Sequence, residues 1–171
     1  MSLGTTAEDV FAPLIGQLAW KASGGYCSFL TLEFGEPHLR VTEPSERQNF
    51  ISEKLRRLHQ RRRVELVGDW HLFVEQAGWT ITTVNGSTTS ADETENWWEP
   101  WLADISGQRL NSVQSPRLGW LTLNFDLGGV IEIRPDEQSR GDVWTLHRWD
   151  DDIAACTHLG AIERTARLPL V

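Results

Sequence analysis

The residues best suited to chemistry in this chain are two histidines in similar local sequences. His71 occurs in GDWHLF and His147 in GDVWTLH. An imidazole can bind a metal or transfer a proton near neutral pH. Both histidines lie in alternating apolar and polar stretches, so we expect them on strands, close together across an internal symmetry axis. They are candidate binding residues, with Glu75 or Asp150 as a third group; equally, isolated strand histidines are ordinary surface or core residues.

A second candidate site is a cluster of three tryptophans, Trp97, Trp98 and Trp101, in the segment NWWEPW. On a helix Trp97 and Trp101 would lie one turn apart. They either clamp that helix to a sheet or form an exposed aromatic anchor, because Trp is enriched at the positions that dominate protein interfaces. We treat these three residues as candidate contacts to another protein.

Two charged runs have simpler interpretations. Residues 47–63 hold seven of the sixteen Lys and Arg residues, which fits a phosphate-binding patch or a helix whose basic last turn complements the helix dipole. The net charge of −8 argues against nucleic-acid binding. Residues 150–152 are three aspartates that could hold a divalent cation but better fit a hairpin turn. No motif for a phosphate-binding loop, a nucleophile elbow or a zinc protease occurs, so an enzyme is less expected than a binding protein, and no cofactor or metal is expected.

The elements that position these residues are predicted by an internal repeat. Residues 12–44 align without gaps to residues 103–135 at an offset of 91, with eight of 33 pairs identical, including LTLxF in both. The segments GDWHLF and GDVWTLH are also similar to each other, and we interpret them as a second repeated segment, the GDW-type echo. We interpret the chain as one domain, residues 1–171, with pseudo-repeats at about 12–84 and 103–160 and an insertion after Pro44.

Within each repeat the apolar residues alternate, as in half-buried strands. Leu30, Leu32 and Phe34 share one face, and Gly128 begins a tight turn in the second copy. A third strand is expected to end at the proline of each copy, Pro44 or Pro135. The pattern predicts a mainly β (α+β) fold, a sandwich or partly open barrel in which two antiparallel meanders face each other across a cleft.

Two peripheral helices are expected. The first begins near Ser45, runs for about four turns and lies over a sheet face or edge. The second lies between Asp92 and Ile105, and Pro100 kinks it or marks its start.

The chain resembles a group of small uncharacterised bacterial proteins in the segments GYCSFLTLEFGEPHL, RRRVELVGDWHLFV and ISGQRL…LTLNFDLGG, across residues 13–148, and departs from them in its last twenty residues. The resemblance implies a bacterial, cytoplasmic protein. The N-terminus shows no secretion signal and no membrane-length apolar run occurs. Cys27 and Cys156 are expected to be free thiols.

These features favour a non-enzymatic module that binds another protein, as immunity or antidote proteins do, or a second copy of itself. The alternative is a small-molecule or metal-binding protein that uses the cleft between the repeats, with His71 and His147 beside it. A hydrolase using Asp and His groups is a third possibility. Neither a membrane nor a nucleic acid is expected as the partner.

Overall fold

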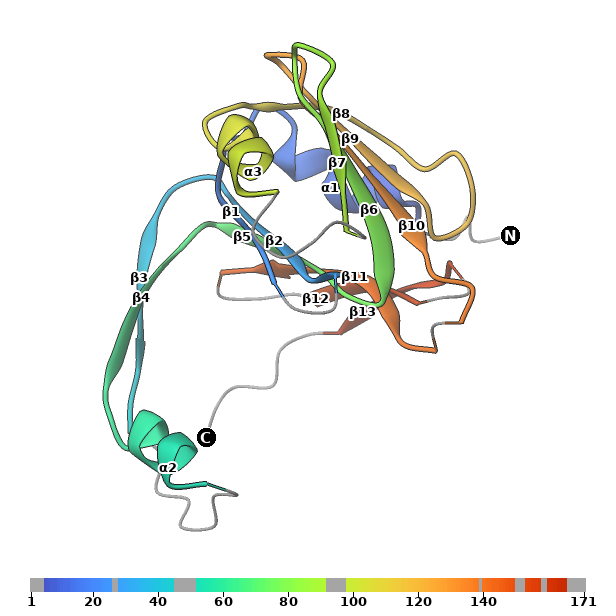
Figure 1. The fold of residues 1–171 in the computed structure, drawn as a ribbon. Coiled ribbons are helices and arrows are strands. Elements are labelled where there is room, and N and C mark those ends of the chain that lie inside the picture. The colour runs from blue at the N-terminus through green and yellow to red at the C-terminus, as the bar shows by residue number, and fades with distance from the viewer. Residues whose placement is uncertain are drawn as a thin grey trace.

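The computed structural model describes residues 5–25, 28–44, 52–91, 98–138, 140–149, 153–157 and 160–165, without the side chains of Leu55 and Leu58. The predicted mainly β, antiparallel fold is confirmed (Figure 1). Among the described helices, none is long and apolar enough to cross a membrane.

The strands form two large sheets and a separate hairpin. The six-stranded sheet has the order β1 (Ala19–Gly24), β2 (Leu30–Phe34), β5 (Trp70–Val74), β11 (Asp142–Arg148), β12 (Ile153–Thr157), β13 (Ile162–Thr165). The five-stranded sheet has the order β7 (Thr88–Ser90), β6 (Ala77–Thr82), β10 (Val130–Pro135), β9 (Leu121–Phe125), β8 (Leu110–Gln114). The hairpin consists of β3 (His38–Thr42) and β4 (Arg63–Val67).

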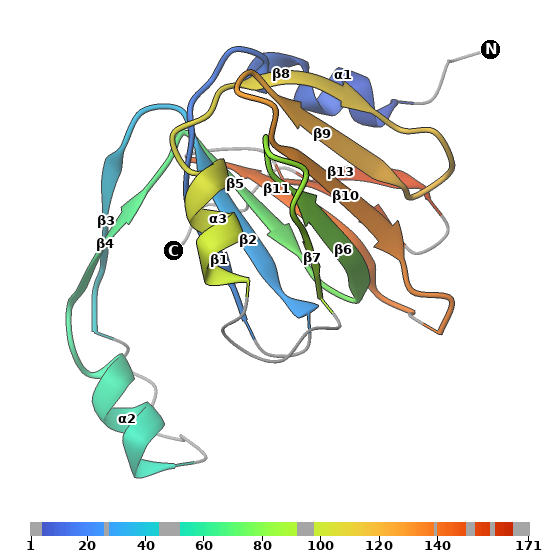
Figure 2. The ribbon, with the colours of Figure 1, turned by 45° about the horizontal axis from the view of Figure 1, so that its top comes forward.

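The helices are short and lie at the margins. Two of them flank the sheets: α1 (Ala7–Phe11), which continues into the 3-10 turn η1 (Ala12–Leu14), and α3 (Glu99–Ile105), which has Pro100 in its first turn as predicted. The third, α2 (Glu53–His59), lies at the end of the β3–β4 hairpin and away from both sheets (Figure 2). The prediction that this helix covers a sheet face or edge is therefore wrong.

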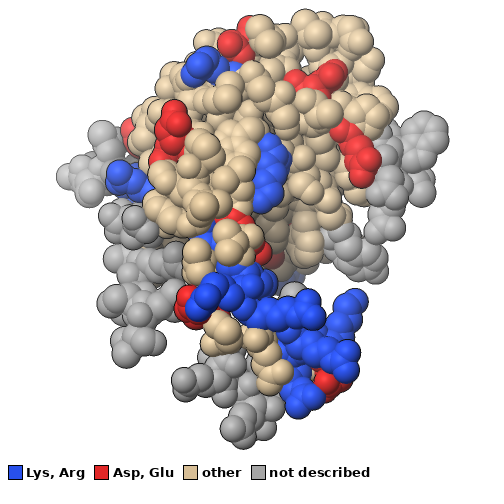
Figure 3. Space-filling model, turned by 90° about the vertical axis from the view of Figure 1, so that its left-hand side faces the viewer, with Lys and Arg blue, Asp and Glu red and all other residues tan. Residues whose placement is uncertain are grey.

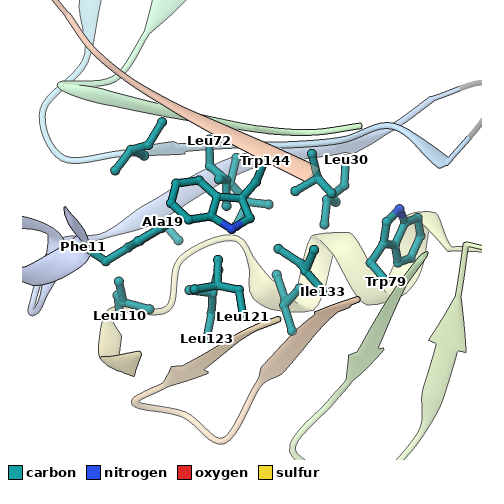
Figure 4. Close-up of a cluster of buried hydrophobic side chains, with 14 of the residues drawn as sticks. Phe11, Ala19, Leu30, Leu72, Trp79, Leu110, Leu121, Leu123, Ile133 and Trp144 are labelled. Atoms are coloured by element: carbon teal, nitrogen blue, oxygen red, sulfur yellow. The ribbon is translucent and has the colours of Figure 1, made fainter. Parts of the chain in front are cut away.

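The core fills the space between the two large sheets. Leu30, Leu72 and Trp144 from the six-stranded sheet meet Leu121 and Ile133 from the five-stranded sheet (Figure 4). All five are at most 1% exposed, and burying one such side chain contributes about 1.5–3 kcal/mol. The two apolar faces that the alternating pattern predicts therefore hold the sheets together.

Hydrogen bonds recur at the same offset of 91 residues. The N–H of Gly16 donates to the carbonyl of Leu110 (2.7 Å), and the N–H of Gly107 donates to that of Ala19 (2.8 Å). Both glycines have positive φ, +81° and +97°, which other residues rarely adopt. Each bond is the counterpart of the other, because adding 91 to 16 and 19 gives 107 and 110.

The strand orders of the two sheets are also related by the repeat. The order β1-β2-β5-β11-β12 in one sheet corresponds, strand by strand, to the order β8-β9-β10-β6-β7 in the other. In register, Trp79 of β6 lies beside Ile133 and Trp144 of β11 lies beside Val74, so the two buried tryptophans occupy corresponding places. Each sheet thus combines strands from both halves, and the two meanders do not form one sheet each.

Two expectations about the repeat are wrong. The third strand of the first half, β3, leaves the sheet and pairs with β4, and β5 takes the place that β10 has in the second half. The GDW-type echo strands, β5 and β11, are neighbours in one sheet, and the counterpart of β11 is β6. The insertion after Pro44 causes both errors, because it lengthens one hairpin and shifts the residues that follow.

Candidate functional site

The most distinctive feature of the molecule is a projecting arm, residues 38–67, made of β3, α2 and β4. It stands away from the two packed sheets (Figures 1 and 2). In the second half a short turn at Gly128, with φ of +91°, joins the equivalent strands. The arm is therefore an addition that the sheets do not require.

One face of the arm is apolar and open to solvent. Leu39 lies opposite Leu66, and Val41 opposite Val64. Their exposed fractions are 66%, 46%, 52% and 59%. Alternation along both strands places these four side chains on the same face. Clustered exposed apolar side chains are typical of interaction sites. We call these four residues the apolar stripe.

The opposite face of the arm is polar and contacts the body at its base. Arg40 lies opposite Glu65. The rings of His38 and Trp149 stack, with centroids 5.1 Å apart and planes 10° apart, and the guanidinium of Arg40 lies 5.6 Å from the Trp149 ring centroid. Since these contacts occupy the polar face, the apolar stripe points the other way.

Asp69 fixes the angle at which the arm leaves the sheet. Its carboxylate pairs with His38 Nε2 (2.7 Å) and accepts the backbone N–H of Glu36 (2.8 Å). Partial burial alone would raise the pKa of Asp69, but these two hydrogen bonds outweigh it and the pKa lies below its usual value. Gly35 has φ of +80°, and a Cβ there would collide with the Asp69 carboxylate, so only glycine fits.

The far end of the arm is strongly basic. Figure 3 shows Lys and Arg gathered there, whereas the visible face of the body is mostly uncharged, with scattered acidic and basic side chains. Glu53 pairs with Arg56 (2.6 Å) and Arg57 (3.1 Å) on α2. Lys54 and Arg61 have no carboxylate within salt-bridge distance among the described residues. These two cations are available to a partner.

The apolar stripe continues into a groove at the base of the arm. Leu66 lines it together with Leu18, Trp20 and Arg109, and its volume is about 340 Å³. The Lys21 ammonium donates to the Leu66 carbonyl (2.8 Å), which ties β4 to β1. The exposed apolar surface therefore extends from the arm onto the edge of the six-stranded sheet at β1.

His71 and His147 lie side by side, as predicted, but not in a cleft between the sheets. They are cross-strand partners on β5 and β11, with ring centroids 6.0 Å apart. They alternate with the buried Leu72 and Leu146, which place the imidazoles on the outer face of the six-stranded sheet. The space between the sheets holds the packed core, so the expected inter-repeat cleft at this pair is wrong.

A buried carboxylate, Glu33, orients His71. It is 4% exposed, accepts from His71 Nδ1 (2.8 Å) and accepts the backbone N–H of Gly68 (2.9 Å). Burial alone would raise the pKa of Glu33, but these hydrogen bonds outweigh it and hold the pKa below its usual value. The carboxylate of Glu33 holds His71 through Nδ1, so Nε2 is the ring nitrogen left for a ligand.

The structure treats the three tryptophans differently. Trp98 is 6% exposed and packs edge-on against Trp79, with centroids 5.8 Å apart. Trp101 is partly buried against the same core. These two residues clamp α3 to the sheets, so an exposed anchor at Trp98 is wrong. Trp97 lies outside the described residues.

The remaining candidates add little to this site. Among the described residues, no group of three or more His, Cys, Asp or Glu side chains is placed to hold a metal. Residues 150–152 and Cys27 lie outside the described ranges. Cys156 is a buried free thiol.

Sequence reasoning missed the arm and Glu33. Alternation in HLRVT and VELV, either side of the basic run, is the signal for two paired strands with one apolar face. No sequence signal separates Glu33 from an ordinary surface glutamate, because its burial depends on the path of the Gly68 backbone. Comparison of the chain with protein-family models, curated proteins and solved structures found no match.

Proposed function

We propose that this protein acts by binding another protein and that the arm is the contact surface. The observation that carries this proposal is the apolar stripe, four apolar residues about half exposed or more on one face of a two-stranded projection. Exposed apolar surface on such a scale is costly in water and is offset when a partner covers it.

The partner would combine an apolar centre with an acidic rim. The stripe supplies the apolar contact, and Lys54 and Arg61 lie free at the same end of the molecule. Apolar contacts supply most of the affinity in such an interface, while charges at the rim set orientation and association rate. The described residues of the arm present binding chemistry, an apolar stripe with unpaired cations beside it, and this supports a binding role over a catalytic one.

The test is gentle capture of the tagged chain from its source cells followed by native mass spectrometry. A protein that binds stoichiometrically to the wild type and is lost from a Leu39→Ser/Leu66→Ser variant supports the proposal. Leu127→Ser, which alters an exposed leucine outside the arm, is the matched control. Equal recovery by the arm variant and the wild type would contradict the proposal.

A second candidate function is ligand or metal binding at His71 and His147. The observation that favours it is the Glu33–His71 pair, since a carboxylate that holds one imidazole nitrogen orients the other toward a ligand. Calorimetric titration with Zn²⁺ tests it. Stoichiometric binding that is lost in both His71→Gln and His147→Gln would support this function. Wild-type heats of binding equal to those of the double variant His71→Gln/His147→Gln would exclude it.

A further inference from the structure

We propose that the partner covering the arm is a second copy of this chain, with each arm lying on the acidic body of the other protomer. This inference rests on the proposed function, because it assigns the same apolar stripe to a specific occupant. If the partner is a second copy, the purified chain alone should form the complex. If the partner is an unrelated protein, it should not.

Charge complementarity carries the inference. Residues 38–67 contain eight Lys and Arg residues and four Asp and Glu residues, so the arm has a net charge of +4. The rest of the chain contains eight basic and twenty acidic residues and has a net charge of −12. The body of the same protein therefore offers the basic arm a surface of opposite net charge. Complementary potentials of this kind promote encounter and fix orientation.

The same charges disfavour the other symmetric arrangement, in which two arms pack stripe to stripe. That arrangement would bring two segments with a net charge of +4 each together. It would also leave the acidic bodies unneutralised. An arm on a body pairs opposite charges twice, once in each direction.

The size of the arm fits a stable interface. In a reciprocal pair each protomer contributes one face of its 30-residue arm and the part of its body that the other arm covers, and together these can reach the roughly 20–30 residues per side of a typical specific interface. Reciprocal exchange about a twofold axis closes the assembly, so two arms are covered and no further copies are recruited. The rigid base at Asp69 and Gly35 favours binding, because an arm held at a fixed angle loses less conformational entropy.

The test is sedimentation velocity of the purified full-length chain over a concentration series, at low and high salt. We expect a reversible dimer of the 19.4 kDa chain. Its dissociation constant should rise at least about tenfold in Val41→Asp/Leu66→Asp, and it should also rise with salt because exposed charges are screened. Val41→Ile/Leu66→Met keeps the stripe apolar and should dimerise as the wild type does.

A second variant controls for the possibility that substitutions in the stripe unfold the arm itself. Lys54→Glu/Arg61→Glu leaves the apolar stripe intact and should also weaken the dimer. A monomeric wild type at every concentration overturns the inference, as does a dimer indifferent to salt or to both variants. If the purified chain is monomeric but captures a different protein through Leu39 and Leu66, the second-copy assignment fails while the proposed function stands.

Discussion

Leu39 and Leu66 face each other across two paired strands, yet both remain largely open to solvent. In the body, opposed apolar pairs such as Leu32 and Leu72 are fully buried between the sheets. The arm therefore carries the sequence pattern of a sheet with one buried face, without the element that would bury it. This mismatch is the basis of the binding surface proposed above.

The apolar stripe should be dispensable for stability. Leu39→Ser/Leu66→Ser should lower the free energy of unfolding by less than about 1 kcal/mol, since it removes one exposed cross-strand pair. Leu72→Ala, at a site that is 0% exposed, should cost about 2–5 kcal/mol. Urea unfolding measures both. A large loss for the arm variant would mean that the stripe supports the fold.

The junction of arm and body should depend on glycine at position 35. Gly35→Ala should destabilise the protein more than Gly86→Ala does, although the two glycines have nearly equal φ, +80° and +79°. A Cβ at Gly86 meets nothing within 4 Å, so that variant measures the backbone cost alone, about 1–2 kcal/mol. The excess at Gly35 reports the collision with Asp69. Equal unfolding free energies would show that the junction relaxes freely.

Glu33 should make stability depend on acid pH. Its folded pKa lies below its unfolded value of about 4.3, so its contribution is fully present above that value and is lost as pH falls through the folded pKa. The difference in unfolding free energy between wild type and Glu33→Gln should therefore shrink as the pH falls below about 4.3 and through the folded pKa of Glu33. Asp69, whose pKa is also lowered, is present in both proteins and cancels from the comparison. A difference that does not change with pH would contradict the lowered pKa of Glu33.

Cys156 should resist alkylation in the folded protein. Burial raises the pKa of its thiol to about 11, and Asp142 adds to the shift. In a Cys27→Ser background, iodoacetamide at neutral pH should label Cys156 only as fast as the protein unfolds. Mass spectrometry with and without urea measures this. Fast labelling of the native protein would show that the strand β12 opens.

The sequence was most informative where local chemistry decides the structure. Alternation at Leu30, Leu32 and Phe34 predicted a buried strand face, and Gly128 predicted a tight turn; the structure has both. Pro100 likewise marks the start of α3. In each case the residues within one turn or one strand are sufficient to predict the local structure.

Several predictions failed where distant segments decide the structure. Trp98 belongs to an apolar cluster in the sequence, but its burial depends on Trp79 nineteen residues earlier. The helix α1 was missed even though Thr6 and Asp9 form a capping box, because five residues give too short a periodic signal. The arm was missed because alternation alone does not show which strand a β-strand pairs with.

The central claim is most directly tested by placing a photo-reactive amino acid at Val41, in the middle of the apolar stripe, and irradiating the protein in its source cells. We predict one dominant protein adduct from Val41. None is expected from the same probe at Val84, an exposed residue between β6 and β7. Protein adducts at Val84 equal to those at Val41, or none at Val41, would contradict the assignment of the arm as the binding surface.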